Sequence, residues 1–267
     1  MQTAFRSYAK KLDKNGQLRG ARKGEKREGV GRPKRHPRAS ERHQVRPPIK
    51  PYEPQHVTMR AHADVSLRKH EVFRAVREAT FAAAQFDERA RTSATPSSAM
   101  SRLGRAFHIV HFSIQRTHIH LLVEASDRTA LSKGMQAFGI SAARQINARL
   151  RARTGQPRKG SVFADRYHVR PLKTPRQVRN CLLYVLNNWK HHGEYAPRDR
   201  NGNTWRVDPY SSGPAFDGWK QRDVLDASAA NPYAGPLVWL PKTWLLAEGW
   251  RRYGLLDVDE IPGHGPE

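Results

Sequence analysis

Apolar residues recur at helical spacing in three segments of this 267-residue chain. One lies over residues 67–86, one runs from Leu131 to Leu150, and one lies over residues 175–192. The apolar positions are three or four residues apart with charged residues between them, which is typical of an amphipathic helix packed on a core. The second segment carries the longest stripe, formed by Leu131, Met135, Phe138, Ala142, Ile146 and Leu150.

The third predicted helix has a start signal and a stop signal. Thr174 can cap its first turn, and the ring of Pro175 suits the first helical position. Gln177 can complete a capping box with Thr174. Gly193 favours an end after residue 192.

Short alternating segments predict a small sheet between these helices. Strands are expected over residues 55–60, 107–114, 118–124 and 162–172. Only Gln115-Arg116-Thr117 separates the second strand from the third, so these two should form a hairpin, and the polar segment 89–101 should be a loop. The order β-α-β-β-α-β-α predicts an α+β domain, a small antiparallel sheet with packed helices.

Charge divides the chain further. There are 48 Lys and Arg against 24 Asp and Glu, a net charge of 48 − 24 = +24. Residues 1–50 hold 16 basic and 4 acidic residues, 16 − 4 = +12, with few large apolar side chains. We therefore expect a basic disordered arm over 1–54, a domain over 55–195, and a Trp-rich extension over 196–267 that contains five of the six tryptophans.

A charge this high argues against an acidic enzyme that acts on small molecules and favours a polyanion as partner, nucleic acid first. Within the arm, residues 31–35 include Arg32, Lys34 and Arg35 and resemble the core of an AT-hook that lies in the minor groove. The other interpretation is an arm that binds phosphates without reading sequence.

Cysteine content and hydropathy indicate the compartment. The single cysteine, Cys181, excludes an internal disulfide framework and a four-cysteine zinc site. The N-terminal residues lack the apolar run of a signal peptide, and no stretch approaches the roughly 18 apolar residues of a membrane helix. We expect a cytoplasmic, nucleoid-associated protein that does not contact membrane.

His118 and His120 form the sharpest local feature. On a strand, residues two apart point to the same face, so both imidazoles would project together while Ile119 faces the core. This geometry suits two ligands of one metal ion. Two partly exposed strand histidines without a metal are the alternative.

The helix over 175–192 carries a second polar feature. Its apolar stripe is separate from a polar stripe that contains Tyr184 and, one turn later, Asn188. The phenol and the amide should therefore lie side by side. Tyr184 is either a nucleophile or a surface tyrosine on this pattern alone.

The two features occur together with a third block in a recognisable order. Residues 117–123 (THIHLLV), 160–170 (GSVFADRYHVR) and 183–188 (LYVLNN) resemble the motifs of the HUH endonuclease superfamily. Within it, the chain resembles the single-tyrosine transposases of insertion-sequence 200 type, and among these the REP-associated tyrosine transposases. The resemblance runs over about residues 55–193 and implies an HUH, ferredoxin-like fold.

The resemblance assigns roles to these residues. Tyr184 would be the nucleophile that forms a 5′-phosphotyrosine, and His118, His120 and Asn188 would bind Mg²⁺ or Mn²⁺. Better-known members have Gln where this chain has Asn188. Tyr167 is a competing nucleophile. Residues expected to support the site or touch DNA are Tyr167, His168, Arg166, Arg170 and Arg144, together with Arg32, Lys34 and Arg35 of the arm.

Three functions follow as hypotheses. The first is a metal-dependent transposase that nicks and rejoins single-stranded DNA at a hairpin, as a monomer or homodimer. The second is a hairpin-DNA-binding protein that has lost the chemistry. The third is an RNA-binding protein of similar architecture, which the absence of an aromatic strand motif disfavours.

Overall fold

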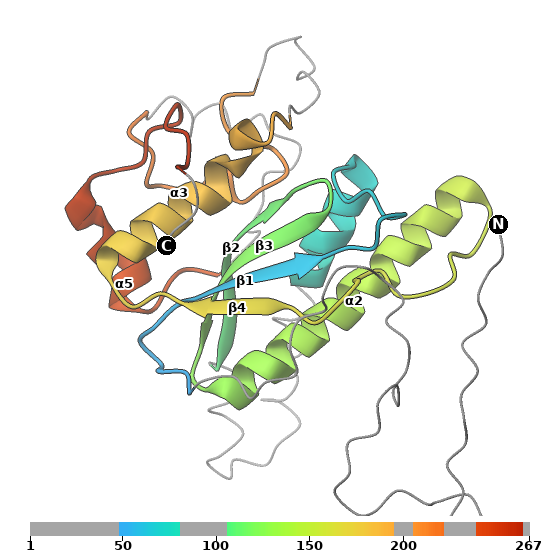
Figure 1. The fold of residues 1–267 in the computed structure, drawn as a ribbon, viewed down its shortest axis with the longest axis horizontal. Helices are drawn as coiled ribbons and strands as arrows, with labels where there is room; N and C mark the ends of the chain where they lie inside the picture. The colour runs from blue at the N-terminus through green and yellow to red at the C-terminus, as the bar shows by residue number, and fades with distance from the viewer. Residues whose placement is uncertain (1–47, 81–105, 195–204, 222–238, 264–267) are drawn as a thin grey trace, which may run out of the picture. The chain divides into compact units, whose positions relative to one another are not determined.

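The computed structural model describes residues 48–80, 106–194, 205–221 and 239–263 (Figure 1). Its centre is an antiparallel sheet of four strands in the order β2-β3-β1-β4. The α+β class expected from the sequence is confirmed. The strands are β1 (Gln55–Arg60), β2 (Phe107–Ile114), β3 (His118–Ala125) and β4 (His168–Pro171).

Strands β2 and β3 form the predicted hairpin, with one irregularity. Ile109 pairs with Val123, but His111 pairs with Leu122, so Val110 is an extra residue in β2. This bulge explains why the large apolar residues of β2 are not spaced by two throughout. Ile109 faces one side of the sheet, whereas Val110 packs on the other side.

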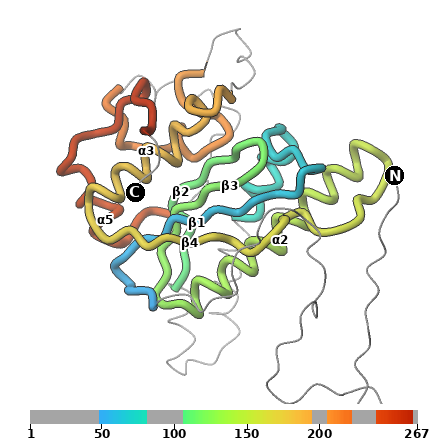
Figure 2. The backbone as a smooth tube through the Cα atoms, in the orientation of Figure 1, coloured from blue at the N-terminus to red at the C-terminus, as the bar shows by residue number. Residues whose placement is uncertain are grey.

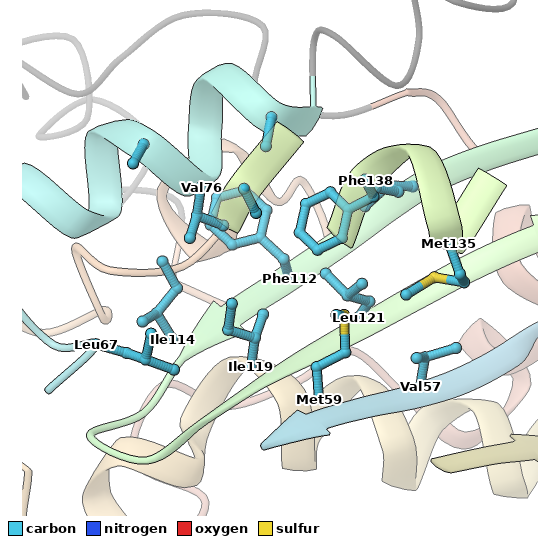
Figure 3. Close-up of a cluster of buried hydrophobic side chains, with 14 of the residues drawn as sticks. Val57, Met59, Leu67, Val76, Phe112, Ile114, Ile119, Leu121, Met135 and Phe138 are labelled. Atoms are coloured by element: carbon cyan, nitrogen blue, oxygen red, sulfur yellow. The ribbon is translucent and has the colours of Figure 1, made fainter. Parts of the chain in front are cut away.

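One face of the sheet is covered by the helix at residues 70–80 and by α2 (Arg128–Thr154). The side chain of Asp127 caps α2 by accepting from the backbone N–H groups of Thr129 and Ala130. Gly155 ends the helix with φ of 70°, a left-handed conformation that favours glycine. The layer between contains a large apolar cluster, of which Figure 3 shows Val57, Met59, Leu121, Met135 and Phe138 among others.

The other face is covered by α3 (Pro175–His191), which Figure 1 shows on the side of the sheet opposite α2. Thr174 caps α3 through the backbone N–H of Gln177, as predicted. The Gln177 side chain accepts from the N–H of Lys173, one residue before the position that a capping box would use.

C-terminal segments pack over α3 (Figure 2). They contain the short helices η2 (Gly213–Ala215), α5 (Trp244–Ala247) and η3 (Gly249–Tyr253). Trp219 and Trp250 are buried against this side of the molecule. Much of the apolar surface of α3 therefore lies beneath the C-terminal segments.

Four expectations need correction or fall outside the described residues. The first helix begins at residue 70 instead of 67, and its predicted end lies outside the described residues. The strand predicted over 162–172 is shorter, because the chain bends at residues 164–165, where Asp165 accepts from the N–H of Arg166; only a bridge between Ala61 and Phe163 precedes β4. The arm up to residue 47 and the loop 89–101 lie outside the description. Among the described helices, none combines the length and apolar character needed to cross a bilayer.

Candidate active site

His118 and His120 on β3 point to the face of the sheet that α3 covers. Their ring centroids are 4.6 Å apart, and the ring planes are nearly perpendicular at 87°. Ile119, between them, is fully buried in the apolar layer on the opposite face. The alternation of a strand thus brings two imidazoles together on one side, as expected.

Helix α3 places Tyr184 and Asn188 against these imidazoles. The ring of Tyr184 meets that of His120 edge-on, with centroids 5.0 Å apart. One turn later, Nδ2 of Asn188 lies 3.4 Å from Nε2 of His120. Asn188 is fully buried and Tyr184 is half-buried. The four residues that the sequence singled out therefore lie in one cluster.

Helix α3 is held in this position from its outer side. Nδ2 of Asn187 lies 3.2, 3.1 and 3.0 Å from the backbone carbonyl oxygens of Asp257, Val258 and Glu260. The guanidinium of Arg179 donates to both carboxylate oxygens of Glu260, at 2.8 and 2.9 Å. These bonds attach the segment 257–260 directly to the helix that carries Tyr184.

Burial determines the protonation of the cluster. It lowers the pKa of His118 from 6.5 to about 4 and places the pKa of His120 well below 6.5. Both imidazoles are therefore neutral near pH 7 and have a lone pair to offer. Burial also raises the pKa of the Tyr184 phenol above 10.0, although its hydrogen bond with Asn188 acts in the opposite direction. The phenol is protonated until a reaction removes its proton.

The donor atoms in this cluster fit a divalent cation. Oδ1 of Asn188 is buried without a hydrogen-bond partner, beside the neutral rings of His118 and His120. Two imidazoles and one amide oxygen form an open set, which suits Mg²⁺ or Mn²⁺ better than a closed structural zinc site. Within the described residues, no three His, Cys, Asp or Glu side chains converge on a metal position.

The other expected site residues are distributed unevenly. His168 and Arg170 lie on β4, directly opposite Thr58 and His56 of β1, and so face the same side as His120. Arg166 is exposed just before β4. Arg144 is not brought to the cluster, because it is exposed on α2, beyond the opposite face of the sheet. Arg32, Lys34 and Arg35 lie outside the described residues.

The competing nucleophile lies elsewhere. Tyr167 was expected on a strand but precedes β4, which begins at His168. Its ring packs against the apolar layer beneath α2, whereas Tyr184 lies on the α3 side. The sheet therefore separates the two tyrosines.

One residue of the cluster has no counterpart among the sequence predictions. Nε2 of His56, on β1, lies 3.1 Å from Nδ1 of His120, and the two rings stack with centroids 5.2 Å apart. Its ring also contacts Tyr184 edge-on, with centroids 5.8 Å apart. Alternation along residues 55–60 placed His56 on the polar side of its strand, but the sequence carries no signal that β1 pairs with β3.

Comparison with known proteins supports the motif assignment. Residues 65–188 match the family model described as "Transposase IS200 like". One similar solved structure is a REP-associated tyrosine transposase bound to a REP hairpin; it is 14% identical with a TM-score of 0.41, over 76% of this chain and 93% of that one. No curated protein matches the sequence. The resemblance to IS200-like transposases is thus confirmed over residues 65–188.

Proposed function

We propose that this chain is a metal-dependent transposase that nicks and rejoins single-stranded DNA through Tyr184. The observation that carries the proposal is the convergence of Tyr184 and Asn188 from α3 on His118 and His120 from β3. Two imidazoles, an amide and a phenol from segments more than 60 residues apart form a cluster in which each has a chemical role. The match to IS200-like transposases supports the same reaction class.

The reaction transfers a phosphoryl group without a nucleotide cofactor. The Tyr184 oxygen attacks the scissile phosphorus and the P–O bond to the 3′ oxygen breaks, while the phenol gives up its proton to solvent and the departing 3′ oxygen takes one up. The products are a 5′-phosphotyrosine and a free 3′-hydroxyl. Attack by a 3′-hydroxyl on the phosphotyrosine reverses these changes and rejoins the strand. His118, His120 and Asn188 would hold Mg²⁺ or Mn²⁺, which polarises the phosphate and offsets its developing charge when bound.

Charge and position indicate how DNA is held. The chain's net charge of +24 provides affinity for phosphates, and Arg170 and His168 lie on the same side of the sheet as the cluster. We propose hairpin DNA with a single-stranded flank as the substrate. The division into arm (1–54), domain (55–195) and extension (196–267) is part of this proposal, as is action as a monomer or homodimer.

The proposal is tested with hairpin-repeat DNA labelled at its 3′ end, because the 5′-phosphotyrosine retains the downstream fragment. With Mg²⁺, the wild-type chain should form a covalent adduct that survives denaturing electrophoresis. Tyr184→Phe should reduce adduct formation below detection, since it removes the nucleophilic oxygen. Tyr167→Phe is the matched control and should retain the adduct, because Tyr167 lies on the other side of the sheet.

Two outcomes contradict the proposal. An undiminished adduct with Tyr184→Phe would assign the nucleophile elsewhere. Salt-sensitive binding of the hairpin without an adduct in any divalent metal would favour the hairpin-binding protein that has lost the chemistry.

A further inference from the structure

We propose that His56 is a positioning residue that fixes the tautomer of His120, so that Nε2 of His120 presents its lone pair to the cluster. This inference rests on the proposed function, because the lone pair matters only if His120 binds a cation there. His56 does not touch the reacting atoms in this account. It acts through His120.

The register of the sheet brings the two histidines together. Strand β1 pairs with β3 so that Thr58 lies opposite His120 and His56 lies opposite Leu122. His56 and His120 are therefore diagonal neighbours on one face, and their rings stack at an interplanar angle of 29°. Nδ1 of His120 lies 3.1 Å from Nε2 of His56 and 3.3 Å from Oγ1 of Thr58.

A neutral imidazole carries one hydrogen, which sits on either Nδ1 or Nε2. If His56 donated to Nδ1 of His120, the hydrogen of His120 would sit on Nε2 and meet the Nδ2 donor of Asn188 at 3.4 Å. If His120 donates from Nδ1 to His56, its Nε2 accepts from Asn188. With the Asn188 amide oriented as in this structure, only the second arrangement gives both contacts a donor and an acceptor and leaves a lone pair on Nε2 of His120.

The same geometry argues against His56 as a cation ligand and against His56 as a group that reacts with Tyr184. Nε2 of His56 is directed at Nδ1 of His120. The nitrogen of His120 that would bind a cation is Nε2, on the other side of the ring. The ring of His56 also contacts Tyr184 by its edge, with centroids 5.8 Å apart, which is a packing contact. A hydrogen-bonded partner on the second nitrogen of a ligating histidine orients the ring and raises its basicity.

The first experiment determines the tautomer directly. Long-range ¹H–¹⁵N NMR of ¹⁵N-histidine-labelled full-length protein, without metal or DNA, distinguishes protonated Nδ1 from protonated Nε2. Wild-type His120 should be protonated at Nδ1, which is the minor tautomer in water. His56→Phe keeps an aromatic ring but removes the acceptor, and it should move the hydrogen of His120 largely to Nε2. His56→Gln restores an acceptor and should retain the wild-type tautomer.

The second experiment measures Mn²⁺ affinity of the same proteins by calorimetry without DNA. His56→Phe should weaken binding about 10- to 100-fold, and His56→Gln should lie between it and the wild type. Thr58→Val, which removes the longer contact, should have the smaller effect. Dispersed NMR spectra establish that each variant is folded, and His56→Gln keeps the test valid if His56→Phe does not fold.

A wild-type His120 protonated at Nε2, or wild-type Mn²⁺ affinity in His56→Phe, would overturn the role of His56. Neither result depends on DNA cleavage. Conversely, an undiminished adduct with Tyr184→Phe would overturn the proposed function and leave the tautomer measurement intact. The two failures are therefore distinguishable.

Discussion

The two faces of the sheet differ in whether they bury polar side chains. Toward the helix at 70–80 and α2, the strand residues are apolar, and the layer contains Val57, Ile119 and Leu121 at 0% exposure. Toward α3, β2 and β3 bury apolar residues such as Val110 and Leu122 but also His111 and His120, at 8% exposure or less. Each strand alternates between these two environments, so neighbouring residues serve different purposes.

The difference separates residues whose burial stabilises the fold from residues whose burial is unfavourable and which we assign to the reaction. Burying apolar surface stabilises the fold without requiring partners. Burying an imidazole or an amide is unfavourable unless each polar atom is paired, and Oδ1 of Asn188 is not. The unpaired oxygen and the neutral imidazoles lie together on the α3 face, where we place the reaction.

The largest expected effect on stability comes from a substitution that opens a cavity in the apolar layer between α2 and the sheet. Phe138→Ala should lower the free energy of unfolding by about 3–5 kcal/mol, because the side chain is fully buried in α2. Urea denaturation measures this change. Ile140→Ala, at a position 46% exposed on the same helix, is the control and should cost within about 0.5 kcal/mol. Adduct formation per folded molecule should be unchanged in both, and a specific loss with Phe138→Ala would break the comparison.

A smaller effect is expected where the C-terminal segment attaches to α3. Asn187→Ala should lower the free energy of unfolding by about 1–3 kcal/mol, because buried carbonyls of the 257–260 segment lose their donor. Asn180→Ala, at an exposed position of the same helix, is the matched control and should change stability within about 0.5 kcal/mol. Equal effects of the two substitutions would mean that this attachment contributes nothing.

The smallest expected effect is a pH dependence of the free energy of unfolding, caused by a buried histidine on the α3 face of the sheet. Burial lowers the pKa of His111 from 6.5 to about 4, so between these values the unfolded chain binds a proton that the folded chain does not. Stability should therefore fall as pH falls from about 6.5 toward 4. His111→Gln should reduce the slope of unfolding free energy against pH by up to about 1.4 kcal/mol per pH unit. Urea denaturation between pH 7 and 5 measures it, and an unchanged slope would mean that folding does not lower the pKa of His111.

Local patterns were enough to predict most elements. Helix α3 begins at the predicted residue, because Thr174 and Pro175 start it by local chemistry. It ends within one residue of its predicted end. The strand predicted over 162–172 was too long, since apolar spacing does not report the bend at residues 164–165. The bulge at Val110 and the strand order likewise arise from pairing between distant segments.

The cluster shows the same division. His118 and His120 are two apart on one strand, and Tyr184 and Asn188 are one turn apart on one helix, so each pair was visible locally. The resemblance to the family's motifs indicated that the two pairs belong to one site. His56 was missed because its proximity to His120 depends on the β1–β3 register, which no local pattern encodes.

The most direct test of the central claim is the position of the covalent bond. The DNA adduct is digested with nuclease and trypsin, and the modified peptide is identified by mass spectrometry. Cleavage after Arg179 and Lys190 yields the peptide 180–190 with Tyr184, whereas Tyr167 falls in the peptide 167–173. We predict a nucleotide on the peptide 180–190. A nucleotide on the peptide 167–173 would place the chemistry on the wrong face of the sheet and contradict this account.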